Sequence, residues 1–197
     1  MPRQRRSSLI ARSIKDHLVL LFGLLGVMWA VVLLDLLPYF HLDAYGIRPR
    51  YVPGLIGIPL APLLHAGINH VAMNSIPFIT LGGIILLSGS RVFWRVTIFV
   101  TLTGGLCVWL FAPAHTNHIG ASGLIFGYLG FLLSRGLFER SLVWILVAVI
   151  ILLFYWSALF GVLPNQPGIS WQSHLFGFLA GIGAARLRFS SGKHLLR

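Results

Sequence analysis

Long apolar segments separated by short polar loops constrain this chain more than any other feature of its sequence. A run of about 20 apolar residues has the length of a helix that crosses the hydrocarbon core of a bilayer. Such a run must be helical, because the bilayer supplies no water to the backbone groups of an open strand or loop. The runs cover approximately residues 18–37, 66–87, 93–112, 121–135, 141–162 and 172–187. The sequence therefore predicts an all-α, polytopic membrane protein, a bundle of about six transmembrane helices.

The composition supports the same fold class. Of the 197 residues, 57% are hydrophobic and 10% are charged, whereas soluble domains carry roughly a quarter charged residues. No basic stretch alternates with stacking aromatic residues, so the expected partner is the lipid bilayer and not nucleic acid. One bundle fills a chain of this length. We expect a basic N-terminal segment over 1–16, the membrane domain over 17–188 and a tail over 189–197.

The net charge of +11 comes from short basic clusters between the apolar runs, as is typical of residues that set membrane orientation. The clusters assigned to one side are the N-terminus, residues 88–95, residues 135–140 and the C-terminal tail. The loops 113–120 and 163–171 lack Lys and Arg. Only Arg48 and Arg50 depart from this pattern. The distribution predicts an integral protein of a bacterial inner membrane with both termini cytoplasmic.

Strongly polar residues occur in or beside three of the runs, where an unsatisfied polar group is costly and marks a functional candidate. With the predicted orientation, the second, fourth and sixth runs begin on the non-cytoplasmic side and carry these residues in their first turns. The residues are His65, His70, Asn74, Ser122, Ser173 and His174. Singly, each has a structural explanation such as polar contact between helices. Together at one depth, they predict a site in the outer leaflet.

The chemistry that this set favours is nucleophilic acyl transfer. A serine hydroxyl needs a neighbouring base, and His174 can serve Ser122 in that role. Negative charge on the attacked carbonyl oxygen needs preorganised donors, which His70, Asn74 and backbone N–H groups at the start of the fourth run can supply. The chain has only four acidic residues, and none is expected beside His174. A Ser–His dyad without a carboxylate is therefore expected.

Small residues mark the faces on which the fourth and sixth runs are expected to touch. His174, Gly177 and Gly181 share one helical face through their i, i+3 and i+7 spacing. Gly123 and Gly127 begin a similar stripe directly after the candidate nucleophile. Close backbone approach along such stripes would bring the hydroxyl and the imidazole within hydrogen-bond reach.

Three short motifs occur in order along the second, fourth and sixth runs. From His65 to Asn74 the chain reads H-x4-H-x3-N, from Gly120 to Gly123 it reads G-x-S-G, and from His174 it reads H-x2-G-x3-G. Together they resemble the signature of rhomboid intramembrane serine proteases. The resemblance covers essentially the whole chain and implies a rhomboid-like six-helix bundle of the bacterial type.

The resemblance also implies roles for the residues and a class of substrate. Ser122 would be the nucleophile and His174 the general base. The oxyanion site would be lined and supported by His70, Asn74, His65, Gly120 and Gly123. Substrates would be transmembrane segments of other membrane proteins, cut near the outer leaflet.

Two departures from the family pattern lie near the predicted base. Ser173 precedes the base, where the family usually has alanine, and Phe126 stands one turn after the nucleophile, where tyrosine is common. Phe126 can still stack on His174. His115 and His118, in the loop before the nucleophile, are expected to be solvated.

Two other functions fit parts of the pattern. A non-catalytic rhomboid-like protein would bind client transmembrane helices, although such relatives typically lack the serine or the histidine. His65, His70 and His174 could instead hold Zn²⁺ with a water molecule, but no acidic residue is expected nearby to support the ligands. Cys107 is the only cysteine, so no Cys-based metal motif exists. We expect no cofactor and no metal, and the sequence does not predict an oligomeric state.

Overall fold

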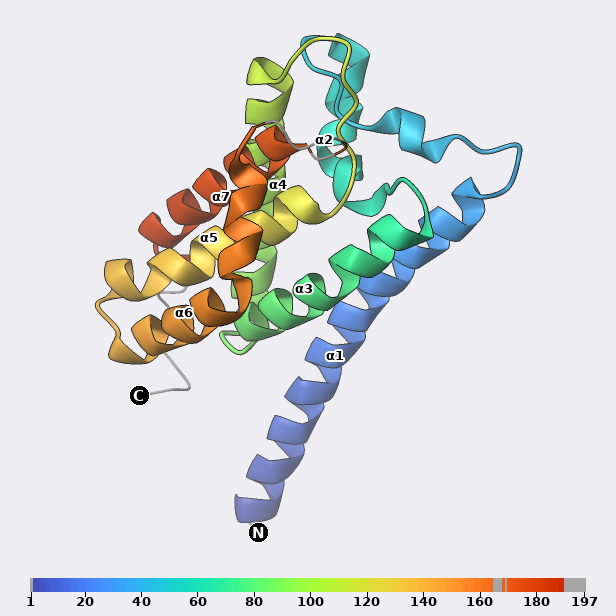
Figure 1. The fold of residues 1–197 in the computed structure, drawn as a ribbon. Coiled ribbons are helices and arrows are strands. Elements are labelled where there is room, and N and C mark those ends of the chain that lie inside the picture. The colour runs from blue at the N-terminus through green and yellow to red at the C-terminus, as the bar shows by residue number, and fades with distance from the viewer. Residues whose placement is uncertain (1, 165–167, 169, 190–197) are drawn as a thin grey trace.

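The computed structural model describes residues 2–164, 168 and 170–189, and these fold into helices joined by short loops (Figure 1). The longer helices are α1 Pro2–Asp35, α3 Ile68–Leu86, α4 Ser90–Phe111, α5 Ser122–Glu139, α6 Leu142–Tyr155 and α7 Trp171–Arg186. The shorter elements are η1 Leu42–Tyr45, η2 Val52–Ile56, α2 Gly57–Leu60, η3 Ala61–Leu63 and η4 Trp156–Val162. No strand is formed by the described residues, which confirms the all-α prediction. Most of the predicted tail, from residue 190 onward, lies outside the described residues.

Four helical stretches within the described residues are long and apolar enough to cross a membrane, and they cover residues 14–35, 68–86, 90–111 and 142–162. In the first and last of these, only 17% and 11% of the most apolar stretch is buried. Side chains that are apolar and exposed over such a length are suited to lipid. The protein is therefore an integral membrane protein with a helical bundle. α5 and α7 are not among these stretches, so the predicted number of crossings stays a prediction.

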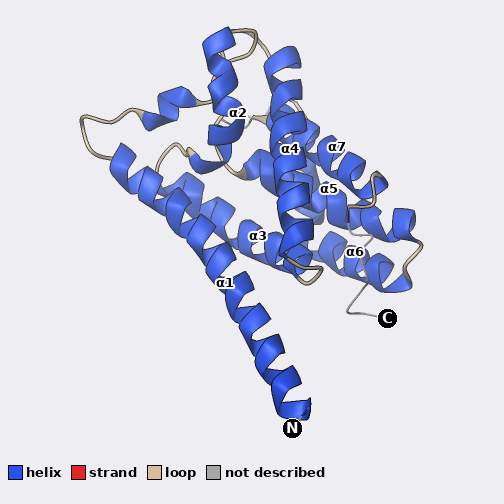
Figure 2. Ribbon diagram, turned by 180° about the vertical axis from the view of Figure 1, so that it is seen from behind, coloured by secondary structure: helices blue, strands red, loops and turns tan. Residues whose placement is uncertain are grey.

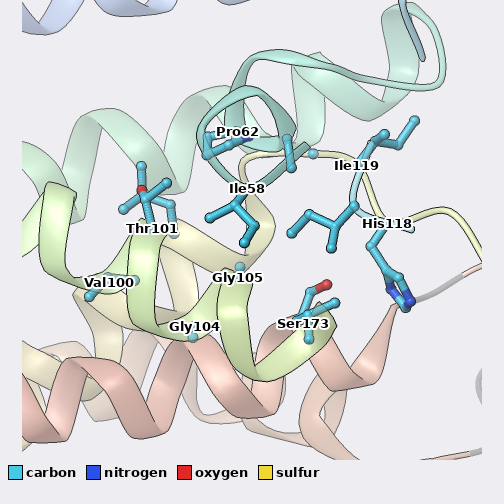
Figure 3. Close-up of a pocket in the computed structure, with 16 residues that line it drawn as sticks. Ile58, Pro62, Val100, Thr101, Gly104, Gly105, His118, Ile119 and Ser173 are labelled. Carbon is cyan, nitrogen blue, oxygen red and sulfur yellow. The ribbon is translucent and has the colours of Figure 1, made fainter. Parts of the chain in front are cut away.

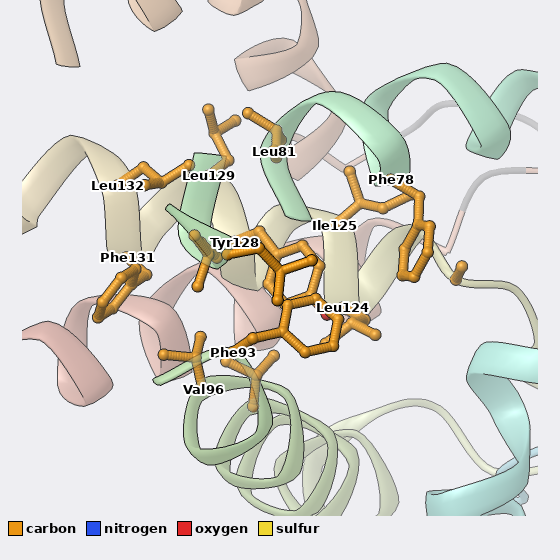
Figure 4. Close-up of a cluster of buried hydrophobic side chains, with 14 of the residues drawn as sticks. Phe78, Leu81, Phe93, Val96, Leu124, Ile125, Tyr128, Leu129, Phe131 and Leu132 are labelled. Carbon is orange, nitrogen blue, oxygen red and sulfur yellow. The ribbon is translucent and has the colours of Figure 1, made fainter. Parts of the chain in front are cut away.

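α5 is the central helix of the bundle. It packs against α3, α4, α6 and α7, and α1 lies along the outer side of α3 (Figures 1 and 2). The core around α5 is built from large apolar side chains (Figure 4). At its centre, the fully buried Tyr128 lies between Phe78 and Phe93 and forms a 2.7 Å hydrogen bond with Thr97 Oγ1. This packing fixes the helix that begins at Ser122.

Arg135, expected in the loop 135–140, lies instead inside α5, which continues to Glu139. Its side chain is fully buried. Nε donates to Glu139 Oε1 at 2.9 Å, Nη1 donates to Ser88 Oγ at 2.7 Å, and the guanidinium carbon lies 3.6 Å from the Trp144 ring centroid. The ion pair and the ring compensate for lost hydration. Arg135 thereby ties the α3–α4 turn to α5 and α6.

The segment between α1 and α3 folds into short helical turns that are hydrogen-bonded to the rest of the bundle. Ile47 and His118 exchange both of their backbone hydrogen bonds, at 2.9 and 3.0 Å. Arg50 Nη1 donates to the carbonyl oxygens of Leu110 at 3.1 Å and Ala112 at 2.8 Å. These carbonyls lie at the C-terminal end of α4, where a cation is favourable. The position of Arg50 therefore has a structural reason that is independent of membrane orientation.

Replacing Arg50 by methionine should lower the free energy of unfolding by about 1 kcal/mol, because two charge-assisted hydrogen bonds of an exposed side chain are lost. Arg48, exposed on the same segment, provides the matched control, and Arg48→Met should leave stability within about 0.5 kcal/mol of the wild type. Unfolding experiments on the detergent-solubilised proteins measure the free energy of unfolding of both variants. Equal losses in the two variants would contradict the capping role of Arg50.

Candidate active site

The chain that enters α5 is held in place immediately before Ser122, the first residue of the helix. Gly120 has a φ of 108°, which side chains rarely adopt. Its N–H donates to the Ala61 carbonyl at 2.9 Å, and the N–H of Ala121 donates to His65 Nε2 at 3.2 Å. The first N–H groups of a helix lack partners within the helix. Ser122 therefore begins a helix whose start is held in place and whose first N–H groups have no partner within the helix.

His65 supports this turn as a neutral ring. Its Nδ1 lies 3.3 Å from the Leu63 carbonyl oxygen, so Nδ1 carries the proton and Nε2 accepts from Ala121. Burial, followed by the neighbouring His70, lowers the pKa of His65 to about 4. The acceptor on Nε2 is therefore present at neutral pH.

His70 and Asn74 face the same turn from α3. The N–H of Ala66 donates to His70 Nδ1 at 3.2 Å, which leaves the proton of the neutral ring on Nε2. A Cβ at Gly120 would lie 2.7 Å from His70 Nε2 and 3.8 Å from Asn74 Nδ2. Asn74 Nδ2 donates to the His70 carbonyl at 3.1 Å and has a second N–H. Two side-chain donors, His70 Nε2–H and Asn74 Nδ2–H, thus lie beside Gly120, two positions before Ser122.

His174 is held on two sides. Its ring stacks on Phe126, with centroids 4.1 Å apart and an interplanar angle of 8°. Its Nδ1 lies 2.9 Å from the Gly161 carbonyl oxygen of η4. Because a carbonyl only accepts, the proton resides on Nδ1 and Nε2 remains able to accept one. Phe126 lies one turn after Ser122, so the ring packs on the face of α5 that carries the hydroxyl. Among the described residues, no hydrogen bond joins Ser122 to His174.

Glycines allow α5 and α7 to touch through their backbones. A Cβ at Gly177 would lie 2.0 Å from the Gly123 carbonyl oxygen, and a Cβ at Gly181 would lie 1.9 Å from that of Gly127. These distances are too short for any side chain. At these glycines α5 and α7 are consequently packed backbone to backbone, with no room for a side chain between them.

A pocket lies near the start of α5 and the first turn of α7 (Figure 3). It contains Gly123 and Ser173, the chain neighbours of Ser122 and His174. The apolar and small residues that complete its wall come from the segment between α1 and α3, the loop before α5, α4, α5 and α7, with Thr101 and His118 as further polar members. The full lining is Ile47, Ile58, Ala61, Pro62, Val100, Thr101, Gly104, Gly105, Val108, His118, Ile119, Gly120, Gly123, Leu124, Ser173 and Gly177.

Two features of this site have no clear signal in the sequence. The Gly161 carbonyl is a backbone group, and no residue type indicates such a partner. His118 was expected to be solvated, and this prediction is wrong, because only 4% of the residue is exposed. Its backbone pairs with Ile47, and this turns the ring toward α7. Burial lowers the pKa of His118 to about 4, so the ring is neutral at neutral pH.

The predicted histidines do not assemble as metal ligands. The His65 and His70 ring centroids are 5.0 Å apart at 72°, and Ala121 and Ala66 already donate to one nitrogen of each ring. Within the described part of the chain, no three His, Cys, Asp or Glu side chains are grouped as a metal site. The geometry therefore offers the zinc alternative no support.

The fold and site together define a helical membrane protein with a serine at the head of a central helix and a histidine stacked against that helix. The model of the Rhomboid domain matches residues 54–191. The chain belongs to the rhomboid family.

Proteins of Mycobacterium and Bacillus are similar to this chain in sequence. An uncharacterized protein of Mycobacterium tuberculosis is 43% identical over 171 residues, covering 82% of this chain and 71% of that protein. An uncharacterized protein of Mycobacterium leprae is 42% identical over 180 residues, covering 86% and 70%. A Bacillus subtilis protein named "Putative rhomboid protease YdcA" is 31% identical over 121 residues, covering 60% of each chain.

Proposed function

We propose that the protein is an intramembrane serine endopeptidase that cleaves transmembrane segments of other membrane proteins through a Ser122–His174 dyad. The observation that carries the proposal is the setting of His174, which stacks on Phe126 at 4.1 Å and engages Gly161 through Nδ1 at 2.9 Å. This setting fixes the tautomer and leaves Nε2 as the basic nitrogen. A carbonyl oxygen takes the place that a carboxylate occupies in a Ser-His-Asp triad.

In the proposed reaction, Ser122 Oγ attacks the scissile carbonyl carbon while His174 Nε2 takes its proton. The oxyanion that forms is stabilised by His70 Nε2–H, Asn74 Nδ2–H and backbone N–H groups at the start of α5. His174 then gives the proton to the leaving amine, and an acyl-enzyme remains on Ser122. Water, activated by His174, hydrolyses the ester and restores the hydroxyl. His65 supports the site through the Ala121 N–H.

The proposal includes a place and an orientation in the membrane. We propose six membrane crossings, with α5 and α7 as the fourth and sixth, both termini cytoplasmic and the active site in the outer leaflet of a bacterial inner membrane. The charge distribution of the sequence supports this orientation. The name of the Bacillus subtilis relative supports the class of reaction.

The direct test uses the purified protein in liposomes with a fluorophosphonate probe and a transmembrane reporter substrate. We expect the probe to label the wild type and mass spectrometry to locate the adduct on Ser122, because only an activated serine reacts. The reporter should be cleaved within its transmembrane segment. Neither should occur with Ser122→Ala.

A folded wild-type protein that is neither labelled nor active on several reporters would contradict the proposal. Retention of a client helix by that inactive protein, measured by co-purification from liposomes, would favour the non-catalytic alternative. Circular dichroism of the same preparation shows whether the protein is folded.

A further inference from the structure

The buried histidine His118 forms a link that the mechanism above does not use. Its Nδ1 is hydrogen-bonded to Ser170 Oγ, and Ser170 Oγ lies 2.7 Å from Ser173 Oγ. On the other side of the ring, Nε2 lies 2.8 Å from Thr116 Oγ1. These contacts connect the loop that enters α5 with the first turn of α7.

The backbone of His118 is held by hydrogen bonds of its own, independently of the contact that its side chain makes with α7. Its N–H donates to the Ile47 carbonyl at 3.0 Å, and its carbonyl accepts from the Ile47 N–H at 2.9 Å. Two residues later, the Gly120 N–H donates to Ala61 at 2.9 Å. The loop that leads to Ser122 is thus attached to the segment between α1 and α3. Through the His118 side chain, the same loop also reaches the helix that carries the base.

Ser170 uses its hydroxyl for this link and not to cap the backbone of α7. It occupies the position before α7, where a serine side chain usually accepts from an N–H of the first helical turn. The α7 helix has no such side-chain cap, and the Ser170 hydroxyl contacts His118 and Ser173 instead. Local preferences of this kind are given up mainly at functional sites.

We propose that His118, acting through Ser170 and Ser173, is a positioning residue that sets the first turn of α7 against the start of α5. This role rests on the proposed function and adds a residue outside the dyad and the oxyanion site. Ser173 directly precedes His174, so displacement of its side chain would move the base. Ser173 and His118 also line the pocket beside the site (Figure 3), so the link forms part of its wall.

The test compares the kinetics of reporter cleavage in liposomes. His118→Asn should lower kcat about tenfold while KM changes by less than about twofold, because misplacement of a base acts on the chemical step. Ser170→Ala should give the same loss, and the double variant should lose no more than either single one. Ser170→Thr keeps the hydroxyl and should retain the wild-type kcat. His115→Asn, at an exposed position of the same loop, is the matched control and should match the wild type.

Each other outcome has a definite meaning. An unchanged kcat in both His118→Asn and Ser170→Ala would overturn the positioning role and leave the proposed function standing. A loss of kcat in Ser170→Ala that Ser170→Thr does not restore would also overturn it, since the hydroxyl would then be unimportant. If His118→Asn does not fold, the Ser170 pair decides alone. A folded wild type without Ser122-dependent cleavage would overturn the proposed function, and the positioning role with it.

Discussion

Replacing either Ser122 or His174 by alanine should reduce the kcat of reporter cleavage by about a thousandfold or more. The hydroxyl is a weak nucleophile until a base accepts its proton. Among the described residues no carboxylate contacts the ring, and the Nδ1 partner of His174 is the Gly161 carbonyl. Removal of either member should therefore remove the same step, and the double variant should be no slower than the single ones.

Matched controls exist on the same elements. Ser134 lies on α5 and donates to the Gly130 carbonyl of its own helix at 2.6 Å, so Ser134→Ala should keep the wild-type kcat. His115→Ala at the exposed loop position should do the same. Measured rates in which the Ser122 and His174 losses multiply would contradict a dyad that acts as one unit.

Gly181→Ala should lower the free energy of unfolding by about 3 kcal/mol or more, because overpacking a rigid contact forces the backbones apart. The new Cβ would lie 1.9 Å from the Gly127 carbonyl oxygen, and a backbone atom cannot move aside as a flexible side chain can. Gly177→Ala should act similarly through the Gly123 carbonyl oxygen at 2.0 Å. It should also reduce cleavage, since Gly123 follows Ser122, the proposed nucleophile.

Gly183 on the same helix supplies the control. A Cβ there would meet Phe99 Cε1 at 3.6 Å, an ordinary van der Waals distance. Gly183→Ala should therefore be neutral or stabilising by up to about 1 kcal/mol, as expected for alanine in a helix. SDS titration of the detergent-solubilised proteins measures the free energy of unfolding of all three alanine variants. If Gly181→Ala and Gly183→Ala lose equal stability, the close approach of α5 and α7 is not the cause.

Much of the fold could be predicted because a bilayer restricts the segments that cross it to a few backbone structures. Apolar runs predicted the helices, and the short loops followed from their spacing. Arg135 was placed in a loop because hydropathy counts a charge as polar wherever it lies. In the folded chain Glu139, Ser88 and the Trp144 ring compensate for its burial, and such tertiary compensation has no signature in a local window of sequence.

The candidate site was predictable to the extent that its residues are rare in membrane helices. Polar side chains expected at one depth and three spaced motifs indicated His70, Asn74, Ser122 and His174 as candidates. His118 was missed because a histidine in a short polar loop has no periodicity that reveals burial. Its position depends on a pairing with Ile47, more than seventy positions earlier in the chain.

The hydrogen bond from His174 to Gly161 has a consequence for genetics. The acceptor is a main-chain oxygen, which every amino acid at position 161 would also possess. A substitution at position 161 adds a side chain and leaves the carbonyl oxygen in place. The added Cβ would lie 2.9 Å from Phe126 Cζ and 3.0 Å from His174 Nδ1. A scan of single substitutions would thus record a steric defect at position 161, while the acceptor itself escaped detection. Only a change to the backbone, such as an ester in place of the amide or a one-residue deletion in η4, addresses that oxygen directly.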